Sequence, residues 1–438
     1  QAELENLWRD MTEEGTRNIT AGSGWLPEPT GYTLLAACRS TELAHEAVFD
    51  TASGERNGAL TYWLLDSLRD IGPGLSYKVL HDRILGKVHA KFEQQTPLLQ
   101  GEGDRAAFGT ERVPPQFAVP VLNVEPSRVR LDAGQVHGLR QGAQFAIYPH
   151  GTTDFADKSR QLAVVEIQGA TDLGGTDSWA AIVERSGERP IEEGDQALLL
   201  GTGNVRLVQN VTLVDDHPPG EVPDSIDQRA AIEALRQALA GNAWVTEVEG
   251  GADYQVSVNG AGAYEIGDMS GAPVKNLRPA IGIDDENAAA QVVQRLEHLA
   301  RYHAVAQLSN ADQRSPLAHK VALDLLGRAR TYDPADPFEP EETFEAQGNV
   351  PTIGTGEWTA LRIRNGASVA LNIALLDLQP DWGITQVYPG GTESFVTLDP
   401  GEERVIPLEG SLPAGYSEGL DTLKLFATQG TTSFRWLE

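Results

Sequence analysis

Cysteine is almost missing from this sequence of 438 residues, in which Cys38 is the single example. A disulfide framework and a cysteine-based zinc site both need several thiols, so both are excluded. Long hydrophobic runs are missing too, since no stretch approaches the roughly 20 apolar residues that cross a bilayer as a helix. The first segment, QAELENLWRDMTEEG, lacks the basic and apolar regions of a signal peptide. These absences predict a cytoplasmic protein.

Basic residues are also scarce, because 34 Lys and Arg stand against 63 Asp and Glu and give a formal net charge of −29 at pH 7. A nucleic-acid-binding surface needs clustered Lys and Arg to replace counter-ions, and anionic membranes attract the same residues. The composition therefore argues against nucleic-acid and membrane partners. The acidity itself fits either solubility, for example in a salty cytoplasm, or the recognition of basic partners.

Changes in composition and periodicity divide the first half of the chain. Residues 1–30 are acidic, contain glycine and proline and have little apolar periodicity, which predicts a linker. Residues 31–112 combine an apolar strand with two helical patterns. Over residues 116–215, short apolar or alternating strands are separated by glycine-rich turns. That pattern is typical of a small antiparallel β-barrel or sandwich.

The second half of the chain follows a proline-rich break. Residues 225–330 predict an α+β unit with two helices on one small sheet, the first helix capped by Asp227 or Ser225. Residues 331–356 are rich in proline and acid and predict another linker. Residues 357–438 return to strand patterns and predict a β-sandwich. The expected fold class is multidomain α/β plus β.

Cys38 is the only candidate thiol nucleophile. It ends the apolar strand pattern GYTLLAAC, and open α/β sheets place active groups at that end of a strand. The alternative is a small buried apolar residue. A nucleophilic cysteine needs a base, but His45 follows too closely in sequence to indicate a dyad. His298 and His303 lie five apart on a predicted helix, which does not align them as zinc ligands, and we expect no metal or other cofactor.

Five short motifs follow one another in residues 31–112. They are Ala37-Cys38, Glu46, Gly58-Ala59-Leu60-Thr61-Tyr62, Ser76-Tyr77 and Gln95-Thr96-Pro97. Their order (a strand ending in cysteine, a polar loop ending in an acid, two helices and a final strand) resembles the small-subunit half of a bacterial caspase-like or metacaspase-type cysteine peptidase. The resemblance implies the C-terminal half of a caspase-like α/β fold. More loosely, SRVRLDAGQVHGLRQGAQFAIYP and LKLFATQGTTSFRWLE resemble the C-terminal accessory domains of multidomain members, where we expect substrate presentation or regulation.

The resemblance removes Cys38 from the catalytic machinery. After a caspase nucleophile a further strand precedes the last two helices, whereas here the helices follow at once, so Cys38 corresponds to a non-catalytic cysteine on the next strand. The family's His-Gly and Asp-Cys-Cys-His-Ser-Gly motifs do not occur in this sequence. The resemblance thus places the His/Cys dyad on an N-terminal catalytic fragment, the expected partner. The start at Gln1 predicts either maturation by cleavage between the two halves or an arbitrary boundary. Pro97 near a potential sheet edge predicts a monomer of the two-fragment unit.

The same resemblance implies a wall of the substrate cleft in the loop from Arg39 to Glu46. Metacaspase-type enzymes prefer Arg or Lys before the scissile bond, because carboxylates in the pocket pair with these cations. Ser40, Glu42 and Glu46 are the candidate pocket residues, and proteins with basic cleavage sites are the implied substrates. Arg39 adds an opposing charge, and a solvated acidic loop is the other interpretation of Glu42.

Two classes of function therefore compete. The first is a cysteine endopeptidase acting in regulated proteolysis, cell death or anti-phage defence. The second is a non-catalytic caspase-like scaffold or regulatory protein that binds partners through its β domains. A structural binding protein whose acidity recruits basic ligands is a plainer version of the second.

Overall fold

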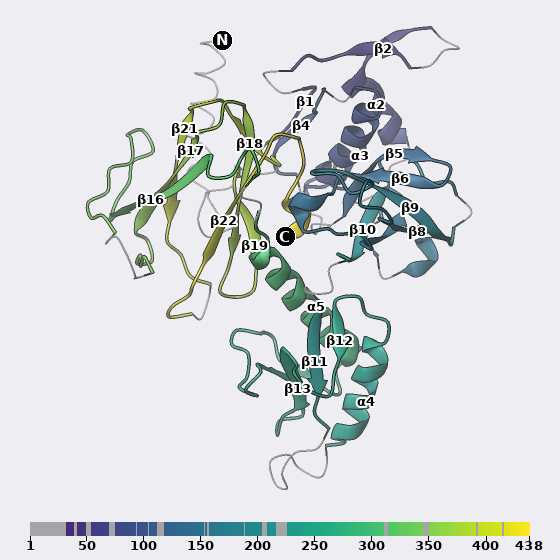
Figure 1. Ribbon diagram of the computed structural model, residues 1–438, viewed down its shortest axis with the longest axis vertical. Helices are drawn as coiled ribbons and strands as arrows, with labels where there is room; N and C mark the ends of the chain where they lie inside the picture. Colours follow the sequence, from purple (N-terminus) through teal and green to yellow (C-terminus); the bar gives the residue numbers. More distant parts are fainter. Residues whose placement is uncertain are drawn as a thin grey trace.

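The computed structural model (Figure 1) describes residues 32–38, 42–49, 54–69, 75–92, 94–103, 105–111, 118–152, 154–155, 157–187, 189–203, 208–215, 226–310, 314–344, 350–390, 393–413 and 416–438. Within these residues the protein is a mixed α/β structure with four α-helices, several sheets and one closed six-stranded barrel. This agrees with the expected class at the level of α/β plus β. No helix of the described residues has the length and hydropathy needed to span a membrane.

The N-terminal unit has one strand pair, one hairpin and two helices. Its elements are β1 (Thr33–Ala36), β2 (Glu46–Val48), β3 (Arg56–Gly58), α2 (Ala59–Arg69), α3 (Tyr77–His89) and β4 (Leu98–Gly101). Strand β1 pairs antiparallel with β4, and β2 pairs with β3. The two predicted helices are present as α2 and α3, and the Ser76 hydroxyl caps α3 by accepting the Val79 N–H. Leu80 and Ile84 of α3 are fully buried against α2.

The second unit is the barrel, so the first of the two predicted architectures is correct. Its strands are β5 (Val119–Glu125), β6 (Arg128–Leu131), β7 (Gln144–Tyr148), β8 (Ala163–Glu166), β9 (Ser178–Arg185) and β10 (Gln196–Gly201), with the short 3-10 helix η2 (Gln135–His137) after β6 and η3 (Lys158–Arg160) before β8. The closed order is β10-β5-β6-β9-β8-β7, with antiparallel pairing throughout. Phe145, Leu131 and Ile147 fill its interior.

The third unit places two helices with one mixed sheet, as expected. Its elements are β11 (Gln209–Leu213), α4 (Gln228–Leu239), β12 (Val245–Glu247), β13 (Tyr254–Val258), β14 (Ala263–Gly267), β15 (Ile281–Gly282) and α5 (Ala288–Gln307). Asp227 is the N-cap of α4 and accepts the Ala230 N–H at 3.0 Å. The predicted boundary at residue 215 is wrong for β11, because β11 pairs parallel with β12 and β13 rather than with the barrel.

The C-terminal unit is a sandwich of two sheets. Its elements are β16 (Val321–Ala329), β17 (Trp358–Asn365), β18 (Leu371–Leu378), β19 (Ile384–Tyr388), β20 (Val396–Leu398), β21 (Glu403–Glu409), β22 (Thr422–Thr428) and the 3-10 helix η5 (Arg435–Leu437). One sheet has the order β16-β17-β21, and β18 is the centre of the other. The predicted limit at residue 330 is therefore corrected, since β16 pairs with β17. Residues 331–356 connect two paired strands of one sheet, and do not separate two domains.

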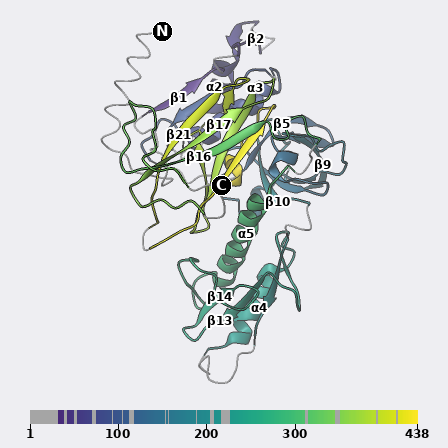
Figure 2. The same cartoon turned by 60° about the vertical axis from the view of Figure 1, so that its left-hand side comes forward.

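The units pack on one another through shared cores. In Figures 1 and 2 the long helix α5 runs from the third unit to the place where the barrel, the sandwich and the C-terminus meet. There the C-terminal segment returns to the barrel: the Thr432 hydroxyl donates to Asp132 Oδ1 at 3.2 Å, and Trp436 joins the core that the barrel shares with α5. The last residues of the sequence thus tie together units that lie far apart in the chain.

Helix α3 lies directly on the barrel because two glycines allow a close approach. A Cβ added to Gly86 of α3 would lie 3.0 Å from the Val121 carbonyl oxygen of β5. One added to Gly194, in the turn before β10, would lie 2.8 Å from Arg83 Cγ. Arg83 itself is buried and its guanidinium contacts the His150 ring of the barrel. The N-terminal unit and the barrel therefore form a tight contact between main chains.

Candidate functional site

Cys38 follows β1 and is half-buried. Its Sγ donates a weak hydrogen bond to the Glu42 carbonyl oxygen at 3.5 Å. Burial, with a smaller contribution from the Glu42 carboxylate, raises the pKa of the Cys38 thiol. A reactive cysteine needs the opposite environment, one that lowers the thiol pKa. The surroundings of Cys38 thus suit a structural thiol and not a nucleophile.

Glu42 is held by Thr96, in the segment that leads into β4. Its Oε2 accepts the Thr96 backbone N–H at 2.7 Å and its Oε1 accepts the Thr96 hydroxyl at 2.9 Å. Thr96 is buried, and Glu42 is half-buried. The carboxylate therefore connects the loop after β1 to the far end of the unit. The interpretation of Glu42 as part of a fully solvated acidic loop does not fit these contacts.

Gln95 fixes the same loop from a second position. Its Nε2 donates to the Ala37 carbonyl at 2.9 Å, and its Oε1 accepts the His45 backbone N–H at 2.9 Å. The side chain of Gln95 is fully buried. Sequence reasoning treated Gln95-Thr96-Pro97 only as the marker of a strand and missed that two of its side chains hold the loop. The Gln-x-Pro motif could have indicated this role of Gln95. A glutamine that is buried beside a strand needs hydrogen-bond partners for its amide group, and a neighbouring loop can supply them.

Glu46, at the start of β2, lies in a more open place. Its Oε1 accepts Arg56 Nε at 3.1 Å across the hairpin, and both side chains are 63% exposed. The neighbouring His45 ring stacks on Phe92 with centroids 4.9 Å apart. Glu46 is thus a solvent-facing carboxylate whose present partner is exchangeable. Ser40, the other candidate pocket residue, lies outside the described residues.

His298 and His303, the pair considered in the sequence as possible zinc ligands, each make a separate hydrogen bond. His298 Nε2 bonds the Trp382 carbonyl at 2.7 Å, and the His303 ring bonds the Tyr254 hydroxyl. The two rings therefore have different partners, a main-chain carbonyl for His298 and a tyrosine hydroxyl for His303. No cluster of three or more His, Cys, Asp or Glu side chains in the described part of the chain is arranged to hold a metal ion.

Comparisons with protein-family models, with curated proteins and with solved structures find no match for this chain. The candidate site is therefore defined by the geometry of the loop between β1 and α2 alone.

The contacts predict a clear difference between the two carboxylates. Glu42→Ala leaves the buried N–H and hydroxyl of Thr96 without their acceptor, so we expect a loss of about 1–3 kcal/mol in the free energy of unfolding. Glu46→Ala removes only an exposed ion pair, and we expect a loss of about 0–1 kcal/mol. Urea denaturation of both variants checks this. Equal losses would mean that Glu42 does not hold the loop.

Proposed function

We propose that this chain is the small-subunit half of a caspase-like cysteine endopeptidase that cleaves proteins after Arg or Lys, followed by accessory domains. The observation that carries the proposal is the order and pairing of the N-terminal unit: strand β1, a loop with a hairpin, helices α2 and α3, and strand β4 antiparallel to β1. The five sequence motifs, together with this element order, are what supports the proposal.

The pairing of β1 supports an association with a second fragment. Within the described residues, β1 pairs with β4 and the sheet contains no other strand. Two strands alone are marginally stable, and an open strand edge is a template for further pairing. Leu34 on β1 is 36% exposed, which leaves apolar surface beside that edge. A catalytic fragment that adds strands along β1 would complete the sheet and bury this surface.

In this proposal the chemistry is divided between two polypeptide segments. The catalytic fragment supplies the cysteine nucleophile, the histidine that acts as acid and base, and the backbone oxyanion hole. This chain supplies a wall of the cleft. The exposed Glu46 carboxylate pairs with the basic side chain of the substrate, exchanging its bond with Arg56. Glu42 and Gln95 keep the wall in place through the contacts described above.

A second candidate function is a non-catalytic scaffold that binds partners through its β domains. The state of Cys38 favours it for the chain taken alone, because a half-buried thiol with a raised pKa is a poor nucleophile. The two functions differ in what an associated fragment brings: the endopeptidase needs His-Gly and Asp-x-Cys-His-Ser-Gly motifs in a partner segment, and the scaffold does not.

Co-expression with the polypeptide encoded immediately upstream tests the proposal. We expect the purified complex to cleave peptides after Arg or Lys, not after Asp, and to lose activity with iodoacetamide. Glu46→Gln should lower kcat/KM about ten- to hundred-fold, the value of one charge-assisted bond. Cys38→Ala should leave activity within a few-fold of the parent.

Two results would contradict this assignment. Absence of cleavage in a complex that carries both catalytic motifs would favour the scaffold. A loss of activity of about a thousand-fold in Cys38→Ala, with the fold intact by circular dichroism, would return Cys38 to the nucleophile position, because losses of that size mark groups that take part in the chemistry.

A further inference from the structure

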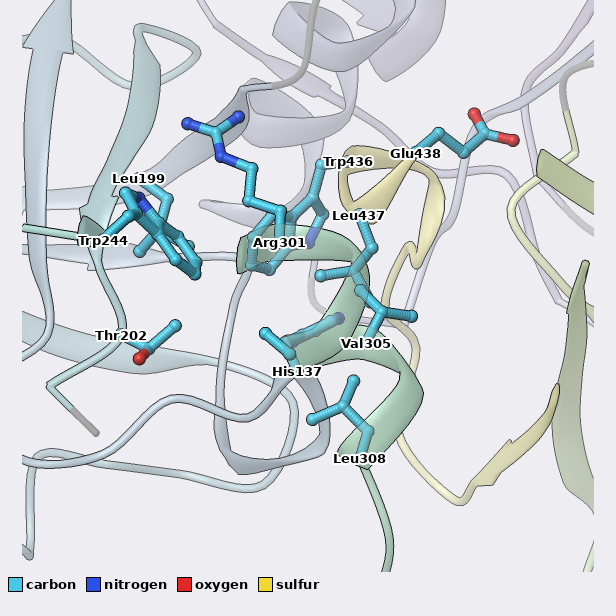
Figure 3. Close-up of a pocket in the computed structure, with 11 residues that line it drawn as sticks. His137, Leu199, Thr202, Trp244, Arg301, Val305, Leu308, Trp436, Leu437 and Glu438 are labelled. Carbon is cyan, nitrogen blue, oxygen red and sulfur yellow. The ribbon is translucent and has the colours of Figure 1, made fainter. Parts of the chain in front are cut away.

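A cavity of about 40 Å³ lies where the barrel, the third unit and the C-terminal segment meet. Figure 3 shows the side chains around it: Trp244 precedes β12, Arg301 lies on α5, and His137 and Trp436 come from η2 and η5. A water molecule needs about 10–15 Å³ of such space, so there is room for a small molecule. No part of this cavity belongs to the loop after β1.

The cavity is lined by hydrogen-bond donors that have no acceptor. Trp244 and Trp436 are 5% and 9% exposed, and the Nε1 atom of each is buried without a hydrogen-bond partner within the described residues. Arg301 Nε is buried and lacks a partner in the same way. Buried polar groups in native proteins are almost always paired, so three unpaired donors at one cavity indicate a missing acceptor.

The cavity also carries a positive charge, which comes from Arg301. The Arg301 guanidinium lies 5.4 Å from the centroid of the Trp244 ring, a cation–π contact. Glu297, on the same helix, acts on it through space, and Glu297 Oε1 accepts Asn242 Nδ2 at 2.6 Å. Arg301 is half-buried with its Nε fully buried, and an anion beside it would offset the cost of that partial desolvation.

His137 and Glu438, two other polar residues at the cavity, have partners elsewhere, and Thr202 also lines the cavity. His137 Nδ1 accepts the Gly134 N–H at 3.1 Å, and its Nε2 faces the Ser433 carbonyl at 3.1 Å, so the ring is neutral and both nitrogens are used. The Glu438 carboxylate points away from the other labelled side chains (Figure 3), where its Oε1 accepts the Gln386 N–H at 2.6 Å. The cavity thus offers donors and one positive charge.

We propose that this cavity binds a small oxyanion, of the size of a carboxylate, through Arg301 and the indole N–H groups of Trp244 and Trp436. A carboxylate has the acceptor oxygens that these donors lack, and its negative charge matches the guanidinium. Since the three donors belong to two units that are distant in sequence, the bound anion would join the third unit to the C-terminal segment. This inference is independent of the proposed peptidase function.

The test uses the intact chain and sodium acetate as the probe. Exchange of sodium chloride for sodium acetate at constant ionic strength should raise the thermal midpoint in a saturable manner, because a ligand that binds only the folded state stabilises it. Tryptophan fluorescence should follow the same binding curve. Arg301→Met should weaken the apparent affinity at least about a hundred-fold, and Trp436→Phe, which keeps the ring but loses one N–H, about ten-fold.

A matched control is available on the same helix. Arg295 is half-buried on α5, donates to the Pro279 carbonyl at 2.7 Å and does not line this cavity. Arg295→Met changes the net charge by the same amount and should keep the acetate response of the parent. Without acetate, Arg301→Met should have a raised midpoint, because a half-buried guanidinium whose Nε lacks a partner has been replaced by an apolar side chain. The absence of any acetate response, or a response that persists in Arg301→Met, would overturn the proposal.

Discussion

Gly194→Ala is expected to lower the free energy of unfolding by about 2–5 kcal/mol. Gly194 has a φ of +87°, and a Cβ there would lie 2.8 Å from Arg83 Cγ and 3.1 Å from the Arg83 carbonyl oxygen. The left-handed conformation costs an L-residue about 1–2 kcal/mol, and overpacking adds about 1–3 kcal/mol. Arg83 is 2% exposed and has no free space to enter, so α3 must move away from the barrel.

Gly241→Ala is the matched control for this substitution. Gly241 also has a positive φ, of +75°, but nothing lies within 4 Å of an added Cβ. Gly241→Ala should therefore lower the free energy of unfolding only by the cost of the left-handed backbone conformation, about 1–2 kcal/mol. Urea denaturation gives the two losses, and hydrogen exchange of α3 tells whether the Gly194 variant loosens that helix. Equal losses, with equal protection of α3, would mean that the contact between α3 and the barrel contributes little.

A buried carboxylate supports this contact from the barrel side. Asp195 is fully buried and pairs with Arg189 through both oxygens, at 2.8 and 3.0 Å. Its Oδ1 also accepts the His150 N–H at 3.1 Å, and the His150 ring contacts Arg83 of α3. The turn that contains Gly194 is therefore held in place on both sides. If the N-terminal unit forms a cleft wall, as proposed, the barrel is its rigid support.

Sequence patterns predicted the elements well where the signal was local. The N-cap of α4 depends on residues within one turn, and Asp227 is one of the two caps that the sequence offered. A local pattern is less informative for β5, because Pro120 lies within that strand and proline argues against a strand interior. In the structure Pro120 lies opposite Gln196, at the place where β5 pairs with β10 by only two residues.

Sequence patterns could not predict which strands pair when the strands are far apart in the chain. The sequences of β11 and β16 are typical of strands, but nothing in them specifies that β11 joins β12 and β13 or that β16 joins β17. The same limit applies to the candidate site. Glu42 was selected for its charge, whereas its contact with Thr96, 54 residues later, depends on the fold. The unpaired donors at the cavity of Arg301 likewise come from segments far apart in the sequence.

His137 should make the stability of the protein depend strongly on acidic pH. Its ring is 3% exposed, between Phe434 and Trp436, and burial lowers its pKa from 6.5 to about 3. The folded state therefore prefers the neutral ring. The stabilising contribution is complete above pH 6.5 and is lost as the pH falls from 6.5 toward 3. At pH 4 the loss is about 3 kcal/mol, since each unit of pKa difference corresponds to about 1.4 kcal/mol.

The buried Asp132 carboxyl acts in the opposite direction at the same junction. Burial raises the pKa of Asp132, so its contribution to stability is complete at low pH and is lost as the pH rises through the folded-state pKa. Comparison of the parent with His137→Gln cancels this effect, because both proteins keep Asp132. Free energies of unfolding at pH 7 and pH 4 should differ by about 3 kcal/mol more in the parent than in His137→Gln. The control is His298→Gln, at an exposed position, which should show the same difference between pH 7 and pH 4 as the parent. Parallel pH curves for the parent and His137→Gln would show that the His137 ring does not titrate as its burial requires.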